Sequence, residues 1–236
     1  MGLLARLRNR ARIAREDGLR PALEPPIALK KMAAPVRSRR RGVPLAAAEE
    51  VTLRAALDAD PNDEEAFRRL ADIVRRRAAE GHEGSEHADP QKAADDAVWS
   101  LAEEMARNGR AWYPLVELAR LSVAQDRDGA LRRLGTAAER DPAGRGLAAS
   151  LAVLRDAGLP NEALGLGVGH WRPREHDPDA GRHLVHAAVE AGRIAEARRH
   201  LASFDQYPDQ ARVGGVRAEL ERTIERADDR SRFTRP

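Results

Sequence analysis

The chain has 236 residues and no cysteine, which excludes disulfides, thiolate metal sites and cysteine nucleophiles. Its 45 alanines and 25 leucines, against 13 valines, 5 isoleucines and 4 threonines, favour helix over strand. Only eight residues are aromatic, so we expect a core of alanine and leucine. The longest apolar runs are a few residues, far short of the roughly 20 that a membrane-spanning helix needs.

Charge is distributed unevenly along the chain. Residues 1–42 hold twelve Lys/Arg and three Asp/Glu, a net of +9, and because the whole chain carries +3 the remainder carries −6. Arginine outnumbers lysine 38 to 3. Such a bias is typical of bacterial genomes of high GC content, so arginine by itself is not a ligand signal here.

Residues 1–42 are predicted to form a basic, mostly disordered N-terminal arm. Leu3, Leu4, Leu7, Ala11 and Ala14 share one side of a short amphipathic helix. The basic residues that interrupt it are Arg6, Arg8, Arg10, Arg12 and Arg15, and these interruptions argue against a secretion signal and for a cytoplasmic location. A linker rich in proline follows, with Arg37, Arg39, Arg40 and Arg41. Four roles stay open for the arm: an unspecific basic tail, a helix that docks on a partner, a nucleic-acid or ribosome contact, and an anionic membrane surface.

From residue 43 the apolar spacing becomes helical. It predicts helices over 45–59, 63–80, 90–107, 111–125, 128–140, 144–157, 160–169, 180–191, 194–204 and 211–228. Asp-Pro pairs at 60–61, 89–90, 141–142 and 177–178 mark helix junctions, because proline fits only the first turn of a helix. We therefore predict a helical domain over 43–228 and a flexible tail over 229–236.

Two segments of this domain resemble the tetratricopeptide repeat. Ala66-Phe67-Arg68-Arg69-Leu70-Ala71 is similar to the first-helix signature of that family, and Ala111-Trp112-Tyr113-Pro114-Leu115 to a second copy. The resemblance covers roughly residues 45–210, with an enlarged loop at 81–89. It implies an all-α, right-handed superhelix of about five helix hairpins, in which small alanines let paired helices touch.

The resemblance also implies a ligand-binding concave surface. Carried over by register, it would hold Arg68, Arg69, Asp72, Arg75 and Arg76, then Arg110, Tyr113, Glu117 and Arg120, then Arg145 and Arg155, then Arg182, His183 and His186. Such a surface would suit an acidic peptide or a C-terminal carboxylate, because arginine forms bidentate bonds with carboxylates. The alternative is that these arginines form ordinary solvated faces, paired with nearby Glu and Asp.

Residues 165–186 contain the other unusual features. His170, His176, His183 and His186 lie within seventeen residues, but their spacing matches no zinc pattern, and we interpret Trp171 as a loop anchor. Gly165-Leu166-Gly167-Val168-Gly169 lacks the context of a nucleotide-binding loop and is expected to allow close approach of a neighbouring helix. We expect no catalytic residue, metal or cofactor. The sequence favours a protein-binding adaptor that takes an acidic segment, with a nucleic-acid or ribosome-associated factor acting through the arm as the alternative.

Overall fold

The computed structural model describes residues 43–82 and 89–233, and the predicted arm with its arginines lies outside these ranges. The described residues belong to one unit, residues 40–236, and contain no strand. The chain is therefore all-α in the part described, as predicted. Its helices are α1 (Val43–Ala59), α2 (Glu64–His82), α3 (Pro90–Ala106), α4 (Tyr113–Ser122), α5 (Arg127–Arg140), α6 (Arg145–Asp156), α7 (Pro160–His170), α8 (Pro178–Glu190), α9 (Ile194–Ala202), the 3-10 helix η1 (Ser203–Gln206) and α10 (Gln210–Phe233).

Helix ends follow the local signals in the sequence. Asp89 caps α3 by accepting from the backbone N–H groups of Gln91 and Lys92, and Pro90 occupies the first turn. Asp177 and Pro178 begin α8 in the same way. Each of the four Asp-Pro pairs lies at a helix junction, as predicted.

The structure differs from the predicted helices at three places. Helix α4 is shorter at both ends, because residues 111 and 112 belong to the turn before it. The predicted helix 194–204 stops at Ala202 and tightens into η1. Helix α10 continues to Phe233, so residues 229–233 are helical where we expected a flexible tail.

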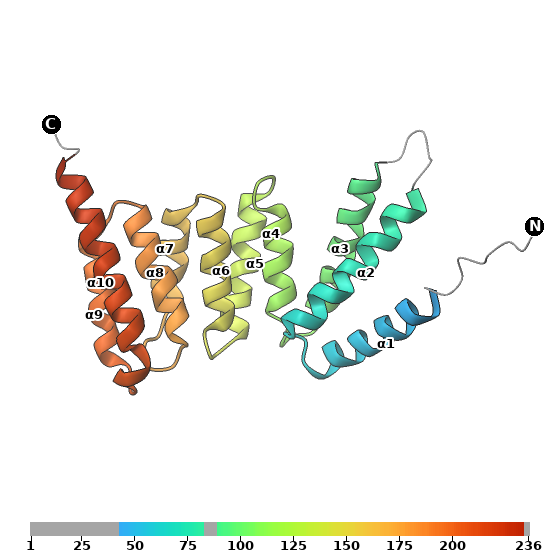
Figure 1. Cartoon of the computed structure of the whole chain (residues 1–236), viewed down its shortest axis with the longest axis horizontal. Helices are drawn as coiled ribbons and strands as arrows, with labels where there is room; N and C mark the ends of the chain where they lie inside the picture. Colours follow the sequence, from blue (N-terminus) through green and yellow to red (C-terminus); the bar gives the residue numbers. More distant parts are fainter. Residues whose placement is uncertain (1–42, 83–88, 234–236) are drawn as a thin grey trace, which may run out of the picture. The chain divides into compact units, whose positions relative to one another are not determined.

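Neighbouring helices in the chain pack on each other, and the chain reverses direction at each turn (Figure 1). Among the even-numbered helices, α4 also packs on α6, α6 on α8 and α8 on α10. Helix α2 joins this row through Phe67, whose ring centroid lies 5.5 Å from that of Tyr113 on α4. The even-numbered helices therefore form one set of direct neighbours, which places the site described below.

The core is built from alanine and leucine, as the composition predicts. Phe67 and Phe204 are the largest side chains that are completely buried, and leucines supply most of the others. Alanines with no exposed surface occur on α3, α4, α5, α7, α8 and α9, and they are Ala102, Ala119, Ala130, Ala137, Ala163, Ala180, Ala187, Ala188 and Ala197. Small side chains at these positions let helices approach closely.

Side chains from distant turns also hold successive hairpins together. The Asn62 side-chain oxygen accepts from the backbone N–H groups of Trp112 (2.7 Å) and Tyr113 (3.1 Å), and its Nδ2 donates to the Arg110 carbonyl (2.9 Å). Arg140 Nη1 donates to the carbonyls of Ala106, Asn108 and Ala111. The turn before α4 is thus fixed from both sides.

The segment between α7 and α8 is anchored by Trp171 and His176. The Trp171 ring lies 5.8 Å from that of Phe204, and a Cβ on Gly181 would come within 2.5 Å of it. His176 is buried against Gly144, and the Asp177 N–H donates to the Ala143 carbonyl at 2.7 Å. The prediction that Trp171 is a loop anchor is confirmed.

Two glycines with positive φ allow this anchor to be tested. Gly144 (φ 79°) and Gly158 (φ 71°) both disfavour a side chain, but only at Gly144 would a Cβ collide, 2.5 Å from that of His176. We expect Gly158→Ala to cost about 1 kcal/mol of unfolding free energy and Gly144→Ala about 3 kcal/mol. Urea denaturation followed by circular dichroism measures both, and equal losses would contradict the packing role of His176.

Candidate functional site

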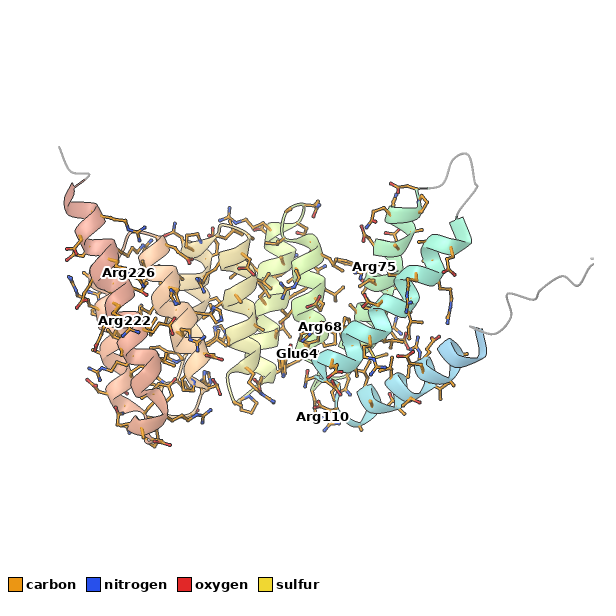
Figure 2. All side chains as sticks on the ribbon, in the orientation of Figure 1. Glu64, Arg68, Arg75, Arg110, Arg222 and Arg226 are labelled. Atoms are coloured by element: carbon orange, nitrogen blue, oxygen red, sulfur yellow. The ribbon has the colours of Figure 1, made fainter. Side chains whose placement is uncertain are left out.

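The predicted binding residues lie almost entirely on even-numbered helices. Helix α2 carries four of them, α4 two and α8 three, while Arg110 lies in the turn before α4. Figure 2 labels Arg68 and Arg75 on α2 and Arg222 and Arg226 on α10. We call the exposed side of α2, α4, α6, α8 and α10 the even-helix face, and define it by Arg68, Asp72, Arg75, Arg76, Tyr113, Glu117, Arg120, Arg155, Arg182, His183, His186, Glu190, Glu219, Arg222 and Arg226.

The arginines of α2 divide into two sets. Arg68 bonds Glu64 at 2.9 Å and also interacts with Tyr113 of α4. Arg69 instead pairs with Glu49 of α1 at 2.6 Å. Consecutive residues on a helix point about 100° apart, so these two neighbours reach different helices. Arg69, expected on the binding surface, belongs to the contact between α1 and α2.

Tyr113 connects α2 and α4 at this face. Its ring packs edge-on against Phe67 and Trp112, and its hydroxyl interacts with Arg68 and Glu117. Burial, followed by the charge of Glu117, raises the pKa of Tyr113 to about 12. The phenol therefore stays neutral near pH 7 and is a hydrogen-bond donor and acceptor between two charged groups.

The other concentration of polar groups lies where α6 meets α8. Arg155 Nε lies 3.1 Å and 3.0 Å from the two carboxylate oxygens of Glu190, and Arg155 Nη1 lies 2.7 Å from His183 Nδ1. One turn further along α8, His186 Nε2 lies 3.9 Å from a carboxylate oxygen of Glu219 on α10. Arg155 and the two histidines thus link three even-numbered helices.

Burial controls the charge of these histidines. Burial, with the adjacent Arg155 cation as the second cause, lowers the pKa of His183 to about 4. Burial also lowers the pKa of His186, again helped by Arg155. Both imidazoles are consequently neutral near pH 7, and His183 Nδ1 can accept from Arg155.

Most arginines of the face already have a carboxylate partner. Arg75 pairs with Asp72 at 3.0 Å, Arg120 with Glu117 at 3.4 Å, and Arg182 with Asp179 at 3.1 Å. Arg76 Nε donates to the backbone carbonyl of Asp72 at 3.2 Å. The sequence-based alternative of solvated, paired faces therefore describes the resting state of this surface.

Several residues of the face were missed from the sequence. Glu190, Glu219, Arg222 and Arg226 were not assigned, although α10 was predicted as a helix. The spacing 219, 222, 226 is a helical stripe and was the available signal. It was passed over because the predicted surface ended with the helix before α10.

The four histidines do not form one cluster. His170 Nε2 lies 3.9 Å from Glu139, and His176 is buried beside Gly144, away from the pair on α8. Within residues 43–82 and 89–233, no three His, Asp or Glu side chains are placed to hold a metal ion. The glycine-rich segment lies inside α7, and a Cβ on Gly167 would meet Leu184 of α8 at 2.5 Å, which confirms the predicted close helix approach.

Comparisons with known proteins give no further guidance. No family model matches the chain, and neither a curated protein nor a solved structure matches it. In the described part of the chain, no helix is both long and apolar enough to cross a bilayer.

The low pKa of His183 predicts a pH-dependent stability. Between the unfolded value of 6.5 and about 4, the unfolded chain binds the proton and the folded chain does not, so the fold loses stability as pH falls through this window. After allowance for partial exposure, we expect a loss on the order of 2 kcal/mol from this residue.

His183→Gln keeps an acceptor for Arg155 but removes the titration. We expect it to reduce the drop in unfolding free energy between pH 7 and pH 4, as measured by urea denaturation. Measurement at pH 8 is the control, because there the difference between the two proteins reports packing alone. An unchanged pH dependence would contradict the assignment.

Proposed function

We propose that this chain is a non-enzymatic adaptor, similar to tetratricopeptide-repeat proteins, that binds a segment of another protein along the even-helix face. The observation that carries the proposal is the row of direct neighbours α4, α6, α8 and α10, joined by α2 through Phe67 and Tyr113. Each of these helices contributes charged or polar side chains to one face. Such a row matches an extended ligand better than a small molecule.

Burial at the repeat-like positions supports the family likeness. Phe67, Leu70 and Ala71 of the first signature are all buried, as are Trp112 and Leu115 of the second. Consecutive helices pack in the order of the chain, and most connections between them are short. These features are those of a chain in which each hairpin covers the next.

An acidic segment is the ligand that these side chains favour. The pairs Arg68–Glu64 and Arg75–Asp72 are exposed, and exposed pairs contribute only about 0–1 kcal/mol each. A carboxylate of a partner can replace the internal acid at low cost and gains a charge-assisted, bidentate bond in a less hydrated interface. Arg76, whose printed bond is to a backbone carbonyl, needs no exchange of ion pairs.

Charge reversal on α2 tests the proposal. We expect Arg75→Glu with Arg76→Glu to raise the Kd for a fluorescent poly-glutamate peptide at least about tenfold, measured by anisotropy. The matched control, Arg132→Glu with Arg199→Glu, makes the same change of net charge on exposed positions of α5 and α9 and should leave the Kd within about twofold.

The basic arm is present in every protein of this comparison, so its own attraction for the peptide cancels. Equal affinities for the two double variants would discard the even-helix face as the binding surface. Unchanged helical circular dichroism shows that both variants remain folded.

A second candidate function rests on the +9 charge of residues 1–42. This segment would bind nucleic acid or the ribosome through phosphates, without base-specific contacts. We expect replacement of Arg6, Arg8, Arg10, Arg12 and Arg15 by serine to weaken binding to a short RNA duplex and to flatten its dependence on salt. Retention of affinity and salt slope would remove this candidate.

A further inference from the structure

The two ends of the helix series differ in how they are covered. Helices α3, α5, α7 and α9 each pack against an even-numbered helix on both sides, whereas α1 has appreciable contact with α2 alone among the described helices. At the other end, every exposed residue of α10 from Glu219 to Arg230 is charged. Helix α10 therefore ends the series with a solvated surface, and α1 does not.

The exposed side of α1 is apolar. Of its exposed residues between Ala47 and Ala59, Asp58 alone carries a charge. Val51 on this side is 69 % exposed, and among the described residues only Val168 on α7 is a comparably exposed large apolar side chain. A solvated helix usually presents charged residues there, so this side is suited to contact with another surface.

A hollow of about 350 Å³ adjoins this side of α1. Val74 of α2 and Ala97 and Leu101 of α3 supply its apolar lining. Arg54 of α1 lies on its rim, one helical turn from Val51. A projecting apolar residue and an apolar hollow therefore lie side by side at one end of the helix series.

The charges around the hollow are balanced. Arg54 pairs with Glu50 at 3.3 Å and with Glu104 at 3.1 Å, and Arg77 pairs with Glu50 at 2.7 Å. The hydrogen bond from Arg77 lowers the pKa of Glu50. Two cations and two anions sum to zero, so a strongly acidic or basic partner gains nothing from this rim. A surface with the same alternating charges complements it.

We propose that the α1 end, defined by Val51, Arg54, Val74, Ala97, Leu101 and Glu104, is the contact surface between two copies of this chain. In a two-fold pair, Val51 of one copy enters the hollow over Ala97 and Leu101 of the other, and the reverse contact forms at the same time. The rim of each copy offers cations to the anions of its partner. This site is separate from the even-helix face and does not depend on the proposed ligand.

Sedimentation velocity of the full chain from about 1 to 200 μM tests the pair, since a contact of this modest size predicts micromolar affinity. We expect a concentration-dependent shift from monomer to dimer. Val51→Asp and Ala97→Asp should each raise the dissociation constant at least about tenfold, because each places a carboxylate in an apolar contact. Val168→Asp, which changes an equally exposed valine on α7, is the matched control and should dimerise like the parent.

The absence of cysteine permits a second, geometric test. Protein carrying Val51→Cys, mixed with protein carrying Ala97→Cys, should give crosslinked heterodimers with a short bismaleimide, and Val168→Cys mixed with Ala97→Cys should not. A monomer at every concentration, or a dimer that Val51→Asp and Ala97→Asp leave intact, would overturn the proposal. Because Val51 is exposed, Val51→Asp is expected to fold, and circular dichroism verifies this.

Discussion

Close contact between helices across alanine is the constraint on which this structure depends. Ala102, Ala119, Ala137, Ala163 and Ala188 have no exposed surface, and leucines fill the space around them. A methyl side chain lets two helices approach until their backbones nearly touch, and Gly167 achieves the same against Leu184. A larger residue at such a position would displace not one helix but every helix packed beyond it, because each rests on its predecessor.

This packing also determines the chemistry of the even-helix face. Since the apolar side of each helix is occupied, polar side chains of α6, α8 and α10 meet on the remaining side. Arg155 then lies beside His183, and burial keeps that imidazole neutral while the guanidinium bonds Glu190. The face is therefore a mixture of fixed cations, exchangeable ion pairs and neutral donors, which suits recognition of a polypeptide more than proton transfer.

The two proposed surfaces have different physical characters. The even-helix face is charged and its pairs are exposed, whereas the α1 end is apolar with a balanced rim. A dimer through α1 would carry two copies of the even-helix face. Two linked faces would bind a partner with repeated acidic segments more tightly than one face does, through effective concentration and without new contacts.

The sequence by itself determined the helices, their junctions, the alanine and leucine core and the anchoring role of Trp171, because caps, prolines and apolar spacing act within a few residues. It also placed most binding candidates on the even-numbered helices. Only the tertiary structure separated Arg68 from Arg69, joined Arg155 to His183 and directed Asn62 to the turn before α4. These contacts join residues far apart in the chain. They depend on the rotation and crossing of packed helices, which spacing along one helix does not encode.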